Sequence, residues 1–427
     1  MSIVNAMYSG VSGLGAESEA LGVVGDNVAN ANTVGFKRSR AQFEDQLGGA
    51  LGSSDGAGVR MARSQQIFAQ GTLQTTGQAT DLALSGDGFF VVKGNIGGTP
   101  GDYYTRDGQL SVRSDGTLVN PGGLAVQGYK AAPDGTYSSS LSDITLPNAA
   151  LPPRATATAT VTANLDATST PPAAPWDPQN PGPTSNLATS MTTYDSLGDA
   201  HTVDVYFRNV APGQWEYHAL AKGAEVSGGT PGQNSEIATG TLDFTTTGAL
   251  QAVTSTVGGT VSFNGATPNQ PFAFEFGKSI AAGGTGLEGS TQFGSPSAIS
   301  GQSQDGYTSG DLGSVKVDGN GVVSGVYSNG QTVAAGKLTI AKFRANEGLA
   351  KAGQNLWAAT NKSGEAALGT VGTGGRGSVV AGALEQSNVD VAEQFVDLIT
   401  HQRAFQANSK VITTADQMLQ ELMTIKQ

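Results

Sequence analysis

The chain offers few side chains that could carry out chemistry. It contains three histidines, His201, His218 and His401, and no cysteine in 427 residues. A zinc or other transition-metal site needs several ligands at fixed spacing, and no second ligand type stands at such a spacing from these histidines. The absence of cysteine also removes disulfides and thiol nucleophiles. We therefore expect structural or surface roles for the histidines and no metal site.

Four short strings imitate parts of catalytic motifs. The spelling GxGxxG occurs at 284–289 and 372–377, but a dinucleotide site needs it between a strand and a helix. A nucleophile-elbow spelling at 52–56 has no strand before it, and a phosphate-loop ending at 277–279 has Phe272 where the first glycine should be. With 61 glycines, chance matches are expected. We predict no catalytic site and no bound cofactor, while an unrecognised carboxylate pair stays open.

The charge of the chain argues against two classes of partner. The formal net charge is −12, and the densest basic cluster is only the segment 37–40. Binding to nucleic acid or to an anionic membrane surface needs clustered Lys and Arg. The chain contains no run of about 18 apolar residues, which is the length that a membrane-spanning helix needs. The first basic residue is Lys37, so we expect no cleavable signal peptide, and either a cytosolic protein or export by another route.

Both ends of the chain show the apolar spacing of helices that pack on another helix. The N-terminal seam comprises Ile3, Met7, Leu14, Leu21, Val24 and Val28, with Gly10 and Glu17 interrupting it. The C-terminal seam comprises Val391, Phe395, Leu398, Phe405, Ile412, Leu419 and Met423, with Gln402, Ser409 and Asp416 interrupting it. Ser387 or Asn388 could cap the C-terminal helix, with Asp390 and Glu393 in its first turn.

The sequence pattern of the segment between the two helices predicts β structure. Asp-Gly and Asn-Gly pairs recur along it, and such pairs accept the positive φ of hairpin turns. One example is a hairpin from Leu110–Val112 to Leu118–Val119 with its turn at Asp115-Gly116. A Pro-rich stretch at 171–183 indicates a surface loop. The sequence therefore predicts a mainly β protein with α-helical termini, and antiparallel strands in its body.

The pattern predicts nested domains, each outer layer being inserted into the one before it. In the inner domain the two terminal helices are expected to pair in a coiled-coil-like manner. Nesting brings the two termini together, so the helices can pair antiparallel. The expected parts are a helical assembly domain at 1–30 plus 388–427, a linker region at 31–70 plus 369–387, a β-rich middle domain at 71–148 plus 299–368, and an inserted β-rich outer domain at 149–298. The Gly-rich stretches Gly48–Gly58 and Gly369–Gly377 are expected to be hinges or passive connectors.

The segment from Asn27 to Lys37 resembles the N-terminal signature of flagellar rod and hook subunits. The stretches that agree with it are 80–92, 104–108, 115–120, 126–129 and 387–410. The residues that we take as the signature are Asn27, Asn30, Asn32, Thr33, Gly35, Phe36, Lys37, Gly86, Asp87, Gly88, Phe89 and Phe90. Rod subunits lack a large central insertion. The long segment 149–298, with its hook-like run at 190–201, therefore favours the hook over the distal rod.

The resemblance implies a structural subunit and no enzyme. A hook subunit assembles with many copies of itself, through its terminal helices, into a flexible helical tube that transmits torque from rod to filament as a universal joint. The resemblance further implies export through the flagellar type III apparatus, an extracellular location in the hook, and contact with the distal rod protein, the hook cap and the hook–filament junction proteins. Two other classes are a distal rod subunit and a secreted β-rich adhesin, which would need an N-terminal signal.

Overall fold

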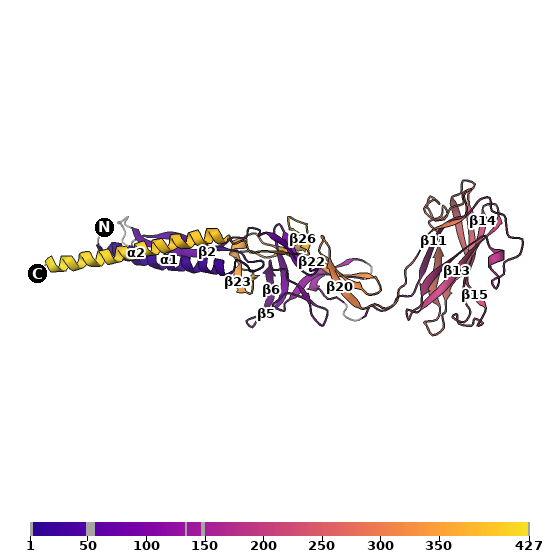
Figure 1. Cartoon of the computed structure of the whole chain (residues 1–427), viewed down its shortest axis with the longest axis horizontal. Helices are drawn as coiled ribbons and strands as arrows, with labels where there is room; N and C mark the ends of the chain where they lie inside the picture. The colour runs from indigo at the N-terminus through magenta and orange to yellow at the C-terminus, as the bar shows by residue number, and fades with distance from the viewer. Residues whose placement is uncertain (1–2, 48–55, 133–134, 147–149, 426–427) are drawn as a thin grey trace. The chain divides into compact units, whose positions relative to one another are not determined.

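The computed structural model describes residues 3–47, 56–132, 135–146 and 150–425 (Figure 1). The chain forms two compact units. The first comprises Met1–Asn148, Gly313–Val326 and Thr332–Gln427, and the second comprises Ala149–Leu312 and Tyr327–Gln331. The outer domain thus ends near 312 instead of 298, because strand β19 (Ala298–Gln304) belongs to it. None of the described helices is long and apolar enough to cross a bilayer.

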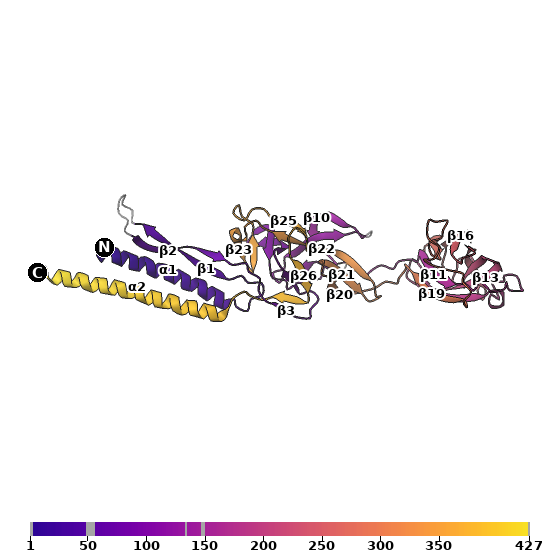
Figure 2. The same ribbon diagram turned by 90° about the horizontal axis from the view of Figure 1, so that it is seen from above.

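The two ends of the chain form helices that pair, as predicted. They are α1 (Ile3–Ala29) and α2 (Val391–Ile425), and they run antiparallel, side by side (Figures 1 and 2). The N-cap of α2 is Asp390, whose Oδ1 accepts hydrogen bonds from the backbone N–H groups of Ala392 and Glu393 at 2.9 and 3.2 Å. The expected caps, Ser387 and Asn388, lie before the helix, and Asn388 binds other parts of the chain.

A two-stranded hairpin stands where a linker was expected at 31–70. It consists of β1 (Ser39–Leu47) and β2 (Gly56–Gln66), which pair antiparallel, and it packs against α1 (Figure 2), while the ring of Phe43 in β1 lies 6.1 Å from that of His401 in α2. Ala41, Phe43 and Leu47 of β1 and Val59 and Met61 of β2 stand at alternate positions, but Asp45 and Arg63 interrupt this alternation, so the apolar pattern is short. Cross-strand pairs such as Glu44 with Arg60 hold them together, and Ser12 of α1 accepts a hydrogen bond from Val59 N. Part of Gly48–Gly58 lies outside the described residues.

Twelve described strands form the main sheet of the first unit. Its path follows β20 (Leu312–Val317), β21 (Val322–Tyr327), β22 (Thr332–Lys342), β9 (Ala125–Ala131), β5 (Phe89–Ile96), β6 (Thr99–Thr105), β24 (Leu356–Ala358) and β23 (Ala350–Gly353), with β7 (Ser111–Val112), β8 (Leu118–Val119), β10 (Tyr137–Asp143) and β25 (Ala367–Thr370) at its margins. The predicted hairpin is confirmed as β7 and β8. Aromatic rings of Phe89, Tyr104 and Phe343 form the centre of a core beside this sheet.

Two short strand pairs bring the segment before α2 back to the start of the β body. Strand β26 (Ser378–Ala381) pairs with β4 (Leu82–Ser85), and β27 (Ala383–Glu385) pairs with β3 (Leu73–Thr75). The expected linker 369–387 is therefore ordered β structure. Its Gly-rich part is a turn in which Arg376 donates to the carbonyls of Ala367, Leu368 and Thr373. These bonds to backbone carbonyls argue against a hinge at Gly369–Gly377.

The second unit is a sandwich of two sheets. One contains β12 (Leu187–Tyr194), β13 (Ala200–Ala211), β14 (Gln214–Lys222), β15 (Asn234–Phe244) and β16 (Leu250–Val257), and the other contains β17 (Gly259–Val261), β18 (Gln270–Glu275), β11 (Thr158–Asn164) and β19. Side chains of both sheets, such as Phe207, Trp215 and Phe272, form one core between them. Strands β11 and β18 run parallel, an exception to the antiparallel expectation, because a long stretch of chain joins them.

Candidate functional site

The facing surfaces of α1 and α2 are built from small and polar residues. Gly10 and Gly13 are buried against α2, where an added Cβ would lie 2.9 Å from Ile412 Cγ1 and 2.5 Å from Asn408 Nδ2 respectively. Asn27 Nδ2 donates to Gln394 Oε1 at 2.7 Å. The helices therefore approach closely, and polar side chains fix their register.

The positions on α2 that face α1 recur every seven residues. They are Gln394, His401, Asn408 and Ala415, and His401 Nδ1 lies 2.6 Å from Glu17 Oε2 of α1. The predicted polar interruptions Gln402, Ser409 and Asp416 each lie one position further along. Of the predicted seam, Ile412 meets α1 at Gly10. Gly10 and Gly13 of α1 have no side chain, which allows the two helix backbones to approach there.

The predicted seam residues divide into covered and exposed groups. Val24 is buried, and Met7, Leu14, Leu21, Val28, Leu398, Ile412 and Leu419 are half-buried. Val391, Phe395, Phe405 and Met423 are exposed, with 41, 51, 38 and 75 % of their surface accessible. The side chain of Ile3 lies outside the described set. The pairing of α1 with α2 therefore leaves a large part of the apolar surface of α2 uncovered.

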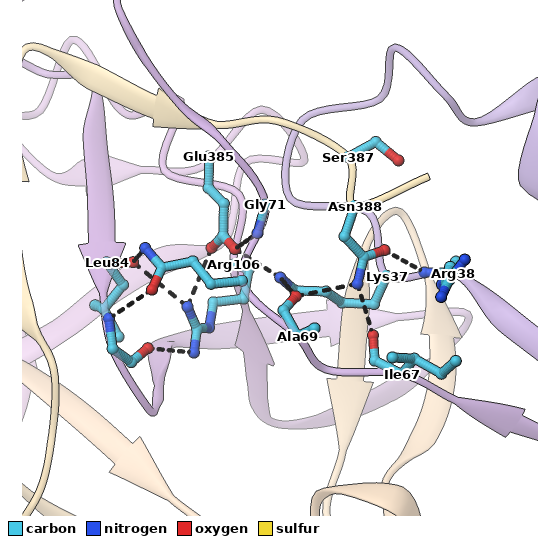
Figure 3. Close-up of polar contacts among 12 residues, drawn as sticks. Lys37, Arg38, Ile67, Ala69, Gly71, Leu84, Arg106, Glu385, Ser387 and Asn388 are labelled. Atoms are coloured by element: carbon cyan, nitrogen blue, oxygen red, sulfur yellow. Dashed lines mark hydrogen bonds and ion pairs between the residues drawn. The ribbon is translucent and has the colours of Figure 1, made fainter. Parts of the chain in front are cut away.

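A buried ion cluster lies where the helices meet the β body (Figure 3). The Glu385 carboxylate accepts hydrogen bonds from Lys37 Nζ at 2.6 Å, Arg106 Nη1 at 3.1 Å and Gly71 N at 2.8 Å. The side chains of Lys37 and Glu385 are fully buried, and that of Arg106 is 5 % exposed. Residues far apart in sequence are thus fixed to one point.

The electrostatics of this cluster depend on Glu385 because it is one anion between two cations. Burial lowers the pKa of Lys37, and the charge and hydrogen bond of Glu385 oppose that shift. Lys37 Nζ also donates to Ala69 O at 2.8 Å, and Arg106 Nη2 donates to Gly86 O at 2.7 Å. A buried charge without its partner is strongly unfavourable. Glu385 is therefore the member of the cluster whose loss would leave the other two charges without a partner.

Asn388 adds a second link beside the ion cluster (Figure 3). Its Oδ1 accepts from Arg38 N at 2.7 Å, and its Nδ2 donates to Ile67 O and Ala69 O. The carbonyl of Ala69 thus accepts from both Asn388 and Lys37. The segment before α2 is therefore bound at the base of the β1–β2 hairpin, both to the residue that precedes β1 and to the residue that follows β2.

The first part of the signature forms the turn between α1 and β1. Asn27 is buried and binds both the N–H and the carbonyl of Ser39, while Asn30 accepts a hydrogen bond from Thr33 Oγ1. Asn32 is exposed. Gly35 has φ +71°, and a Cβ there would lie 2.6 Å from Asp107 N, so no larger residue fits. Gly35 N also donates to Glu385 O at 2.7 Å.

The second part of the signature lies in the β body. Phe89 and Phe90 are buried, and Gly86 and Gly88 have positive φ. Asp87 O accepts from Gly377 N at 2.7 Å. From the first part, Phe36 is buried, and the Lys351 ammonium lies 5.7 Å from the centre of its ring. These residues build and cover the junction, which is a structural role.

Each histidine lies 2.6–3.5 Å from at least one carboxylate. The partners are Asp195 and Glu225 for His201, Glu216 and Glu236 for His218, and Glu17 for His401. Within the part of the chain that the structure describes, no three His, Asp or Glu side chains converge as metal ligands do. The geometry supports packing and assembly of chains, with the helix pair and its junction as the candidate site.

Four segments match known flagellar families. Residues 7–37 match "Flagella basal body rod protein", 83–164 match "Flagellar hook protein FlgE/F/G D1 domain", 164–307 match "Flagellar basal body protein FlaE D2 domain", and 380–425 match "Flagellar basal body rod FlgEFG protein C-terminal". The flagellar hook protein FlgE of Escherichia coli (strain K12) is 36 % identical over 427 residues, covering 99 % of this chain and all of that protein. The chain belongs to the flagellar hook protein family.

Relatives in distant bacteria agree with this assignment. The hook proteins FlgE of Salmonella typhimurium (strain LT2) and Treponema pallidum (strain Nichols) are each 35 % identical and cover 97 and 99 % of this chain, and 98 and 100 % of their own length. The crystal structure of Helicobacter pylori hook protein FlgE2 matches with a TM-score of 0.52 at 15 % identity, covering 73 % of this chain and all of that one. That likeness concerns the fold alone. It agrees with a mostly β, multi-domain hook-family chain.

Sequence reasoning did not find the contacts that hold the junction of this hook-family chain. Glu385 was not singled out, and Arg106 and Asn388 stand in the matching stretches 104–108 and 387–410 without these contacts being expected. A buried-charge argument could have pointed to Lys37, since it is the first cation of the chain and lies in the signature. Its partner could not be chosen among 35 acidic residues without the fold.

Proposed function

We propose that this chain is the structural subunit of a flagellar hook, a helical polymer of many copies that connects rod and filament. The observation that carries the proposal is the uncovered apolar surface of the helix pair. Besides the exposed seam residues, the exposed side chains are Val4, Tyr8, Val11, Val396, Ile399, Val411 and Met418. Fully burying such a side chain contributes about 1.5–3 kcal/mol. Side-by-side packing of copies would bury this surface.

The junction supports a mechanical role. Force applied to the helices passes to the β body through Glu385, Asn388 and the short pairs β4–β26 and β3–β27. Four connections at one place resist bending between helices and body better than a single linker would. We propose that the inner helical layer holds the tube together while weaker contacts of the outer domain change as the tube bends.

The remaining parts of the proposal come from the family. They are export through the flagellar type III apparatus without a cleaved signal, an extracellular place in the hook, and contact with the distal rod protein, the hook cap and the hook–filament junction proteins. The family assignment and the full-length agreement with hook proteins favour this function over a distal rod subunit, an adhesin or an enzyme.

The test is polymerisation of the full-length chain observed by electron microscopy. The wild-type chain is expected to form curved tubes. Phe395→Asp combined with Ile399→Asp should abolish them, because both side chains are about half exposed in the single copy and are proposed to be covered in the tube. Gln402→Asp, at an exposed polar position of the same helix, is the control and should still polymerise. Straight tubes would favour a distal rod subunit, and an absence of wild-type tubes under varied salt and concentration would contradict the proposal.

A further inference from the structure

The second unit carries most of the charge of the chain. It contains thirteen acidic and four basic residues, a formal charge of −9, compared with −12 for all 427 residues. Two copies of this unit repel each other when charged surfaces meet, and at physiological salt the repulsion acts over about 8 Å. A contact between neighbouring copies is therefore favoured only where the surface carries no charge.

The strand edges of the sandwich are such a surface. β12 and β16 are the edges of one sheet, and β17 and β19 are the edges of the other. None of these four strands contains Asp, Glu, Lys or Arg. Of the five strands inside the sheets, β13, β14, β15 and β18 each contain at least one charged residue, and β11 contains none. Soluble proteins commonly place charges on exposed edges to prevent strand-to-strand association. The edges of this unit lack that protection.

The four edges lie on two different sides of the sandwich. On one side β16 adjoins β17, because only Gly258 separates Val257 from Gly259. On the other side β12 adjoins β19, and Thr189 Oγ1 donates to Gln302 Oε1 at 3.2 Å. A contact between two unlike surfaces continues from copy to copy, whereas a surface that binds itself closes a dimer. Two unlike, uncharged sides suit an open helical polymer.

The β16–β17 side also offers apolar area. A cleft of about 320 Å³ opens between the sheets there, lined by Tyr217, Phe272 and Phe274 and by Val253 and Val257 of β16. Val257 is 49 % exposed. At the start of β16, the backbone groups of Leu250 and Gln251 bond to the loop at 280–286. From Ala252 to Val257, β16 pairs among the described strands with β15 alone, and this part of its outer edge presents backbone groups and apolar side chains together.

We infer that the β16–β17 edge of one copy binds the β12–β19 edge of the next copy. This inference rests on the proposed polymer and names the contact of its outer domains. Ser, Thr, Gln and Ala dominate the exposed side chains of these strands. Hydrogen bonds among the Ser, Thr and Gln side chains contribute little net free energy, because water forms equivalent bonds with the same groups. Each contact is therefore weak, and neighbouring units can shift along one another without separating charges.

Introduced cysteines test this contact, because the chain has none of its own. A full-length chain carrying Thr254→Cys on β16 and Ser303→Cys on β19 is polymerised and treated with a short bis-maleimide. A ladder of dimers, trimers and larger multiples is expected on a denaturing gel, with monomer alone from either single variant. Thr202→Cys on the inner strand β13, combined with Ser303→Cys, is the matched control and should give no ladder. No ladder from the first variant, or dimers from Thr254→Cys alone, would overturn the head-to-tail contact.

A charge placed on the edge gives an independent measurement. Thr254→Glu should raise the concentration needed for polymerisation several-fold, because the contact would desolvate a charge that meets no opposite charge on the β12–β19 edge. Thr202→Glu should leave that concentration unchanged, and thermal unfolding of both monomers checks that they are folded. If the wild type polymerises and Thr254→Glu matches it, the edge contact is wrong while the proposed function stands. If the wild type does not polymerise, both are wrong.

Discussion

Lys37 and Glu385 form an ion pair with 2.6 Å between Nζ and Oε1, although 348 residues separate them in sequence. Both side chains are fully buried, and Arg106 binds the second carboxylate oxygen at 3.1 Å. This relationship joins the turn after α1 to the strand that leads into α2. The two ends of the chain are therefore fixed to the β body at one charged point.

The first prediction concerns the single anion of this cluster. Glu385→Gln leaves two buried cations without a counter-charge and should lower the free energy of unfolding of the first unit by about 3–5 kcal/mol. Lys37→Met should lower the free energy of unfolding by a smaller amount, because the Glu385 carboxylate and the Arg106 guanidinium still pair. Urea unfolding of the full-length chain measures both. Glu393→Gln, which removes an exposed partner of Arg38, is the control and should cost at most about 1 kcal/mol. Equal losses for Glu385→Gln and Glu393→Gln would contradict the prediction.

The second prediction separates two kinds of glycine in α1. Gly13 faces Asn408 at close range, so Gly13→Leu should push the helices apart and lower the melting temperature of the helical signal. Gly22 has nothing within 4 Å of an added Cβ, so Gly22→Ala should stabilise the helix by about 0.5–1 kcal/mol. Circular dichroism at 222 nm during heating checks both. A stabilising Gly13→Leu would show that α1 and α2 do not pack as described.

The third prediction tests the cap of α2. Asp390→Ala removes the acceptor for the N–H groups of Ala392 and Glu393 and should cost about 1 kcal/mol. Asp390→Asn should keep most of this stability because its side-chain oxygen can accept the same bonds. Amide hydrogen exchange of Ala392 and Glu393 is the direct measurement. If these amides exchange faster after Ser387→Ala than after Asp390→Ala, then Ser387 and not Asp390 caps α2.

The fourth prediction concerns acid stability of the second unit. The pKa of Glu236 is lowered, first by its hydrogen bond with His218. A carboxylate with a lower pKa in the folded state binds fewer protons there than in the unfolded state. Its stabilisation is therefore present above its unfolded pKa and is lost as the pH falls through its folded pKa. Glu236→Gln should make the loss of stability between about pH 5 and pH 3 less steep.

Urea unfolding monitored at several pH values measures that slope. The control is Glu288→Gln, which removes an exposed carboxylate from the loop between β18 and β19. Identical slopes for wild type and Glu236→Gln would show that the pairing of His218 with Glu236 does not contribute to acid stability.

The residues that local physics governs could be predicted. Three-four spacing marks Leu14, Leu21, Leu398 and Ile412 as helical, and the helices lie where that spacing is found. Asp115-Gly116 marks a turn, and β7 and β8 flank it. Each of these signals depends on neighbours within one or two turns of chain, so no knowledge of distant segments is needed to interpret it.

The contacts between distant segments were decided only by the tertiary structure. The hairpin β1–β2 has only a short, interrupted apolar alternation, and it exists because its two strands pair with each other and pack on α1. Gly13 and Asn408 meet because small residues let two helix backbones approach, a property that apolar spacing does not record. The sequence by itself determined the terminal helices, the β body and the family signature. Only the fold determined that Glu385 neutralises Lys37, because the partner depends on which distant segments meet when the chain folds.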